Sequence, residues 1–175
     1  MTSEFQLDKL DRAFDQIDVN SNGQIERNDL IGLGSRLLLG FGQSPTSAKG
    51  QAVLAAWDAV WTELSDGEDA LSPSEFRGAM VSAFIEGEKF DSTLLPLAQS
   101  VARLADTDGD GKVSAAEFHV MARAFGTSAA DSRYAFSALA DSQEALTVDD
   151  LVQALREYYT SPDPGARGNA VFGPL

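Results

Sequence analysis

The stretch DTDGDGKVSAAE at residues 106–117 (loop 3) carries the strongest structural signal in the chain. Counting from its first residue, Asp106, Asp108 and Asp110 place carboxylates at positions 1, 3 and 5. Gly111 at position 6 can take the positive φ that a side chain would resist. A tight turn that delivers oxygens from alternating positions is suited to wrapping a hard cation.

The rest of loop 3 completes the set of oxygen ligands. Lys112 at position 7 offers its backbone carbonyl, Ser114 at position 9 can hold a bridging water, and Glu117 at position 12 can close the site with both oxygens. These positions match the EF-hand calcium loop, D-x-[DN]-x-[DN]-G-x5-E. A solvated acidic turn would also be rich in Asp and Gly, but it predicts neither apolar Val113 at position 8 nor Phe118 directly after the loop. We therefore predict that loop 3 binds calcium.

The same pattern recurs in DVNSNGQIERND at residues 18–29 (loop 1). Its twelfth residue is Asp29, which is one methylene shorter than Glu and reaches an ion less easily with both oxygens. Loop 1 also carries three formal negative charges where loop 3 carries four. We expect weaker calcium binding here, with Mg2+ competing for the site. The predicted ligands of loop 1 are Asp18, Asn20, Asn22, Gln24, Glu26 and Asp29.

Two further segments repeat the spacing without the ligands. They are LSDGEDALSPSE at residues 64–75 (loop 2) and LADSQEALTVDD at residues 139–150 (loop 4). Both have Leu at position 1 and neither has Gly at position 6, so we do not expect either loop to bind calcium well. Ser72, Pro73 and Glu75 in loop 2 instead match a helix capping box with Pro at the first helical position.

Position 8 of every loop is apolar, and apolar stripes at helical spacing flank each loop. The position-8 residues are Ile25, Leu71, Val113 and Leu146. We expect them to meet across short antiparallel bridges, joining loop 1 to loop 2 and loop 3 to loop 4. The predicted fold is all-α: four EF-hand helix-loop-helix motifs in two paired lobes that pack compactly. A silent loop is retained because a lone helix-loop-helix cannot bury its apolar faces.

This pairing divides the chain into an N-terminal EF-hand pair at residues 1–88 and a C-terminal pair at residues 89–161. Gly87 begins the segment that we take as the boundary. Residues 162–175 form a tail whose Pro-rich start cannot continue a helix. The tail ends in apolar residues, among them Phe172. A frayed terminus is the ordinary interpretation, and we favour a tail docked in an apolar cleft.

The amino-acid composition narrows the classes of partner that the protein is expected to bind. The net charge is −14, from 27 acidic and 13 basic residues, which disfavours nucleic acid and anionic membranes. The chain has no Cys, which excludes disulfides and thiol catalysis. No segment approaches the roughly 20 apolar residues of a membrane span, and the start of the chain does not match a signal peptide. We expect a monomeric, cytoplasmic protein that does not insert into membranes.

Other candidate sites are weak. His119 is the single histidine, so multi-histidine metal sites are excluded, and a boundary position on a helix is expected for it. Trp57 and Trp61 could line a ligand pocket, although tryptophans at helical spacing more often belong to a core. No P-loop, nucleophile elbow or glycine-rich dinucleotide loop occurs. The chain is not expected to be an enzyme.

The chain resembles the sarcoplasmic calcium-binding protein family and, more narrowly, its bacterial calerythrin-like members. The resemblance rests on residues 14–27, on loop 3 and on the GNAVFG tail at residues 168–173. It implies a cytosolic calcium buffer; loop 4, usable in some relatives, is disabled here, which leaves two Ca2+ ions. Two alternatives remain open. One is a sensor that exposes an apolar groove to a protein target, and the other is a carrier of an apolar small molecule, as luciferin-binding relatives of the fold imply.

Overall fold

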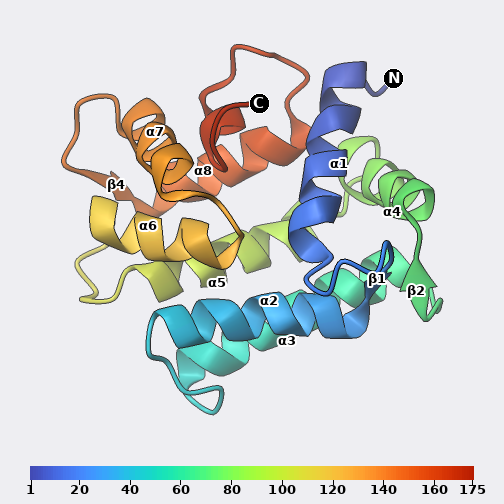
Figure 1. The fold of residues 1–175 in the computed structure, drawn as a ribbon, viewed down its shortest axis with the longest axis horizontal. Coiled ribbons are helices and arrows are strands. Elements are labelled where there is room, and N and C mark those ends of the chain that lie inside the picture. The colour runs from blue at the N-terminus through green and yellow to red at the C-terminus, as the bar shows by residue number, and fades with distance from the viewer.

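A computed structural model describes all 175 residues, and its helices begin and end at the four loops (Figure 1). Each loop lies between an incoming and an outgoing helix, as an EF-hand requires. The α-helices are α1 (Glu4–Ile17), α2 (Arg27–Gly40), α3 (Ala48–Ser65), α4 (Pro73–Met80), α5 (Leu95–Ala105), α6 (Ala115–Ala124), α7 (Ala129–Ala140) and α8 (Val148–Thr160). Two π-helical segments, η1 (Val81–Ile85) and η2 (Phe90–Leu94), and a 3-10 helix, η3 (Arg167–Ala170), complete the helical elements.

The outgoing helices begin at capping boxes that use positions 9 and 12 of the loops. In loop 2 the Glu75 carboxylate accepts from the Ser72 backbone N–H at 2.8 Å. The Ser72 side chain in turn accepts from the Glu75 N–H, which satisfies two backbone donors at the start of α4. The capping interpretation of Glu75 is confirmed. Thr147 and Asp150 form the same pair at the start of α8.

The loops pair as predicted through very short strands. These are β1 (Ile25–Glu26), β2 (Ala70–Leu71), β3 (Lys112–Ser114) and β4 (Ala145–Thr147). Both pairs are antiparallel, with Ile25 opposite Leu71 and Val113 opposite Leu146. Each of these four residues is buried, so the bridge also anchors its loop pair to the core. The all-α fold of four EF-hand motifs with two short β-bridges is confirmed.

One continuous hydrophobic core runs through both halves of the chain. Helix α3 packs against α5, and α2 packs against α6, so each half supplies walls for the other. Trp57 on α3 contacts Phe125, which follows α6, with ring centroids 6.3 Å apart. Trp57 and Trp61 are both buried, in agreement with the core interpretation. No helix is both long and apolar enough to cross a membrane.

The tail returns to the body of the protein between α1 and α7, above α8 (Figure 1). Val171 and Phe172 have no exposed surface, and Phe172 packs on the rings of Phe125 and Tyr158.

The segment at residues 81–94 connects the two halves of the chain and is more helical than the sequence suggests. Two π-helical segments flank a bend at residues 86–89, so the break around Gly87 is short and the chain enters α5 directly from η2.

Candidate metal centres

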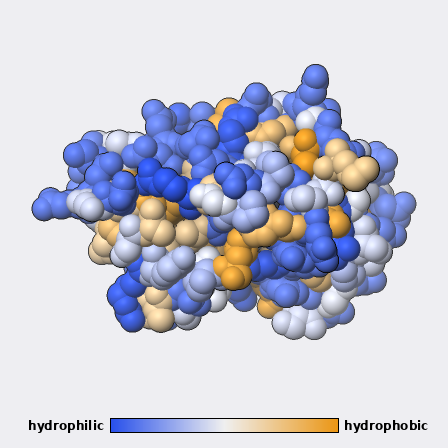
Figure 2. Space-filling model, turned by 90° about the horizontal axis from the view of Figure 1, so that it is seen from above, coloured by the Kyte–Doolittle hydropathy of each residue, from blue (hydrophilic) through white to orange (hydrophobic).

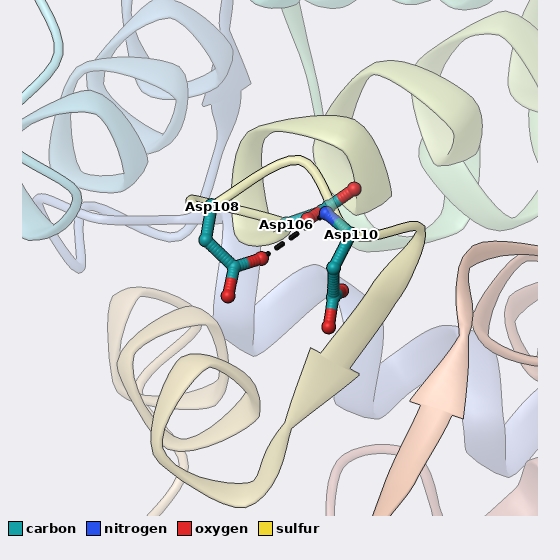
Figure 3. Close-up of side chains that lie close together, drawn as sticks. All are labelled: Asp106, Asp108 and Asp110. Carbon is teal, nitrogen blue, oxygen red and sulfur yellow. Dashed lines mark hydrogen bonds between the residues drawn. The ribbon is translucent and has the colours of Figure 1, made fainter.

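Loop 3 gathers three carboxylates at the end of α5. One oxygen from each of Asp106, Asp108 and Asp110 lies within 4.8 Å of the others (Figure 3). The Asp106 carboxylate accepts from the backbone N–H groups of Gly109 at 2.8 Å and Gly111 at 3.0 Å. Asp108 accepts from the Asp110 N–H at 3.1 Å. These bonds curl the backbone around the carboxylates, and the like charges at this spacing are the donor set that a divalent cation neutralises.

Glu117 faces the same loop from the first turn of α6. One carboxylate oxygen accepts from the Thr107 N–H at 2.9 Å, and the other accepts from the Ser114 N–H at 2.8 Å. Burial raises the pKa of the Glu117 carboxyl, but the hydrogen bonds from Thr107 and Ser114 outweigh it and hold that pKa below its usual value. Glu117 is therefore ionised at neutral pH, as a closing calcium ligand must be.

Loop 1 has similar internal hydrogen bonding. The two oxygens of Asp18 accept from the N–H groups of Asn22 at 3.1 Å and Gly23 at 2.9 Å. The Asn20 side chain accepts from the Asn22 N–H, and the Asn22 side chain accepts from the Gln24 N–H, both at 2.9 Å. Gly23 has φ +80°, close to the +82° of its counterpart Gly111. The two loops thus fold alike although they share few residues.

Asp29 gives the clearest indication that loop 1 suits a cation. Its side chain is 1% exposed. One carboxylate oxygen accepts from the Glu26 N–H at 2.9 Å, while the other has no hydrogen-bond partner. A buried carboxylate oxygen without a partner is costly, and a bound cation would satisfy it.

The remaining predicted ligands lie where the loop pattern requires. Lys112 begins β3, and its side chain is exposed, so only its backbone carbonyl is suited to a metal. Gln24 directly precedes β1 in the same position of loop 1. Ser114 and Glu26 stand at position 9 and are also the N-cap residues of α6 and α2. The assignment of these residues as ligands stays a prediction.

Loops 2 and 4 turn differently. Their first residues, Leu64 and Leu139, are buried in the core and cannot ligate. The next turn is made by Asp66 and Asp141 in the left-handed region, with φ of +46° and +44°. The hydrogen bond from the Ser72 side chain, followed by that from its backbone, lowers the pKa of Glu75. Glu75 caps α4 as Glu117 caps α6, so the expectation that loop 2 is silent rests on Leu64 at position 1 and not on Glu75.

A comparison with known protein families matches the two loops that carry the predicted calcium ligands. The EF hand family profile matches two segments, residues 10–33 and 103–122, which contain loops 1 and 3. At these two segments the chain is similar to EF-hand proteins. Calerythrin from Saccharopolyspora erythraea is 28% identical over 169 residues, which cover 91% of this chain and 94% of calerythrin.

Two solved structures extend the comparison. A calcium-binding protein of Streptomyces coelicolor, associated with prokaryotic calcium-mediated regulation, aligns with a TM-score of 0.77. The two sequences are 28% identical, and the alignment covers 90% of this chain and 99% of the Streptomyces protein. The sarcoplasmic calcium-binding protein of amphioxus aligns over 100% of both chains at a TM-score of 0.70 and 20% identity, which supports the fold. The predicted resemblance to sarcoplasmic and calerythrin-like proteins is confirmed, and calcium binding is the function at family level.

The sequence analysis missed several residues that support the loops. Thr107 donates to Glu117 from position 2, which the loop pattern leaves free. Lys49, at the start of α3, donates to the backbone carbonyl of Asp106 at 2.9 Å, so the first half of the chain contacts loop 3 directly. Lys9 and Arg12 on α1 hold the tail. No local pattern marks these residues, because Thr107 occupies a position that the motif leaves free and the partners of the others are distant in the chain.

Proposed function

We propose that the protein is a calcium buffer that binds two Ca2+ ions, one in loop 1 and one in loop 3. The observation that carries this proposal is the shared set of side-chain-to-backbone hydrogen bonds around Asp18 and Asp106. In each loop the first aspartate accepts from the glycine at position 6, which fixes the turn that calcium coordination needs. The proposal divides the chain at residues 1–88 and 89–161, each part with one calcium loop and one silent loop.

The ligands of the two loops differ in strength. Loop 3 has Asp at positions 1, 3 and 5 and Glu at position 12. Loop 1 has neutral Asn20 and Asn22 and closes with the shorter Asp29. Loop 3 is therefore the tighter calcium site, and Mg2+ competes at loop 1 because it tolerates a smaller ligand set completed by water.

The test is a calorimetric Ca2+ titration with and without Mg2+. Two binding events are expected, and Mg2+ should weaken the looser one more than the tighter one. Four binding events of comparable strength would contradict the proposal, since loops 2 and 4 would then be active. A single event would limit the buffer to one loop.

We favour a buffer over a sensor because the chain has three methionines, few for an adaptable groove that binds target helices. Met80 and Met121, the methionines that a groove for target helices would use, are 3% and 0% exposed. The large exposed apolar side chains lie singly on different elements: Met1, Leu39, Tyr134 and Leu175. Figure 2 shows a mainly hydrophilic face with small separate apolar areas. Retention on a hydrophobic resin should be unchanged by Ca2+; calcium-dependent retention would favour a sensor.

A second candidate, carriage of an apolar small molecule, has one observation in its favour. A cavity lined entirely by apolar side chains, among them Trp57, Tyr159 and Phe172, lies inside the core. Its volume is about 40 Å³, room for a few atoms only, so a larger ligand would have to displace Phe172. A chromophore or lipid that co-purifies with the protein would support this candidate over the buffer.

The acidic surface supports the rest of the proposal. A net charge of −14 attracts cations and repels nucleic acid and anionic lipid. We also propose that the protein is a monomer, that it is cytoplasmic and that it has no enzymatic activity. Light scattering after size exclusion, with and without Ca2+, checks the monomer; a stable dimer in either condition would contradict it.

A further inference from the structure

Three helices make polar contacts with the tail: α7 accepts from Arg167 at the Leu139 carbonyl, α8 accepts from the Gly168 N–H at Glu157, and α1 supplies two cationic side chains. The Lys9 ammonium donates to the Asn169 side chain at 3.0 Å and to the Ser161 carbonyl at 2.8 Å. Arg12 donates to the Pro174 carbonyl at 2.6 Å and, with its other terminal nitrogen, to the Phe172 carbonyl. We call Lys9 and Arg12 the tail clamp.

The tail clamp belongs to the helix that leads into loop 1. Helix α1 ends at Ile17, and its C-cap is Asp18, the first predicted ligand. The Asp18 N–H donates to the Phe14 carbonyl at 2.9 Å, so the ligand continues the helical hydrogen bonding. Arg12 lies six residues before Asp18, about 9 Å along a helix that rises about 1.5 Å per residue. A contact that fixes Arg12 therefore also fixes the orientation in which α1 presents Asp18.

The docked end of the tail is rigidly held. Phe172 is fully buried, with ring centroids 5.2 Å from Phe125 and 4.9 Å from Tyr158. Asn169, 7% exposed, also donates to the carbonyls of Asp163 and Pro164. The buried tail can therefore hold α1 in place, although the two lie at opposite ends of the sequence.

Loop 1 has more to gain from such support than loop 3. Its Asn20 and Asn22 contribute no charge, and Asp29 must reach the ion with a short side chain. Weak ligands bind well only if they are already in place, because ordering them lowers the affinity. Loop 3 has no comparable contact between the tail and its incoming helix α5.

We propose that the docked tail is a positioning element of the first calcium site: by holding α1 through Lys9 and Arg12, it raises the Ca2+ affinity of loop 1. The proposal rests on the proposed binding of calcium to loop 1. Linkage makes the effect reciprocal, so Ca2+ in loop 1 also strengthens the docking of the tail.

The charge of Arg12 allows a test, because its electrostatic effect and its effect through the tail change the Ca2+ affinity of loop 1 in opposite directions. Arg12 and Arg36 line the same polar cleft beside Asp18, but only Arg12 contacts the tail. Removing either positive charge should, by Coulomb's law alone, raise the affinity of loop 1 for Ca2+. If Arg12 acts through the tail, Arg12→Gln lowers that affinity while Arg36→Gln leaves it unchanged or raises it.

The experiment uses the full chain with Glu117→Gln, so that calorimetry reports loop 1 alone. Arg12→Gln should weaken Ca2+ binding about fivefold, the lower end of typical coupling between sites. Arg12→Lys should recover part of the loss, because an ammonium can still donate to one of the two carbonyls. Equal affinities for Arg12→Gln and Arg36→Gln would overturn the proposal. No calcium binding in the Glu117→Gln parent would instead refute the proposed function at loop 1.

A second measurement leaves α1 intact and tests reciprocity. The chain has no Cys, so Leu175→Cys, at a position 55% exposed, accepts a single spin label. In the Glu117→Gln background, Ca2+ should reduce the mobility of this label. Label mobility that is the same with and without Ca2+, under conditions where calorimetry shows loop 1 filled, would overturn the proposal.

Discussion

Loops 3 and 2 share their scaffold and differ in their chemistry. Both present an apolar residue to a β-bridge, Val113 and Leu71, and both use a glutamate at position 12 to cap the next helix. They diverge at position 1, where loop 3 has Asp106 and loop 2 has buried Leu64. Positions 8 and 12 therefore serve folding in every loop, and we expect a calcium site only where position 1 also offers an acid and position 6 a glycine. An acidic residue at position 12 alone does not indicate a calcium site.

The largest expected effect comes from Glu117, the glutamate that caps the helix after loop 3. Glu117→Gln should weaken the tighter calcium site more than about a hundredfold, beyond the usual cost of losing a group that only supports a ligand. The fold should persist, since Gln can still accept the capping hydrogen bond. Calorimetric titration would show one of the two binding events missing.

Glu75→Gln is the matched control. It changes the same residue type at the same loop position and should leave both calcium events in place, with a stability loss of at most about 1 kcal/mol from the altered cap. An equal loss of calcium binding from Glu75→Gln would break the distinction between loops 3 and 2.

Glycine substitutions should give the next largest effect. Gly111 has φ +82° and Gly67 has φ +91°, with open space around both, so Ala costs about 1–2 kcal/mol of backbone strain at either position. At Gly111 the ion-bound loop must bear that strain, so Ca2+ affinity should fall about tenfold. Gly67→Ala should lower the melting temperature without changing calcium binding. A calcium defect of similar size in both variants would refute the separate roles of the two loops.

Asp29→Glu should sharpen the difference between loops 1 and 3. The longer side chain can reach the ion with both oxygens, so Ca2+ affinity at loop 1 should rise several-fold while Mg2+ competition falls. Titrations with and without Mg2+ measure both changes, with the event of loop 3 as an internal control. Stronger Mg2+ competition in this variant would contradict the assignment of Asp29 as the closing ligand.

The last prediction concerns the pH dependence of stability that comes from Lys9, the α1 residue that contacts Asn169 of the tail. Burial lowers the pKa of Lys9 from 10.5 to about 8. The unfolded chain therefore keeps this proton to higher pH than the folded chain does, and stability should rise with pH between about 8 and 10.5. Denaturant unfolding of Lys9→Met should lack this rise. Lys89→Met, which removes an exposed lysine, is the control and should keep it.

Local pattern made loops 1 and 3 and the two β-bridges predictable. In each loop the residues that fix the turn lie within twelve positions, and their spacing alone dictates the hydrogen bonds. The expectation that loop 2 is silent also rests on local pattern, because Leu64 at position 1 offers no side-chain oxygen. The π-helical segments at residues 81–85 and 90–94 were not predicted, since no local pattern separates a π-helix from an α-helix, although the break at Gly87 between them was expected. The tail clamp joins residues about 160 positions apart, beyond any local rule.

The position of the tryptophans has a practical consequence. Trp57 and Trp61 both lie on α3, outside loops 1 and 3, and Trp57 touches Phe125 just beyond the helix that leaves loop 3. Intrinsic fluorescence of this protein therefore reports the seam between its halves and not the coordination of either ion. An emission change on adding calcium would measure how far a filled loop moves α6 against α3, and a silent spectrum would mean that the ion is taken up without disturbing that seam.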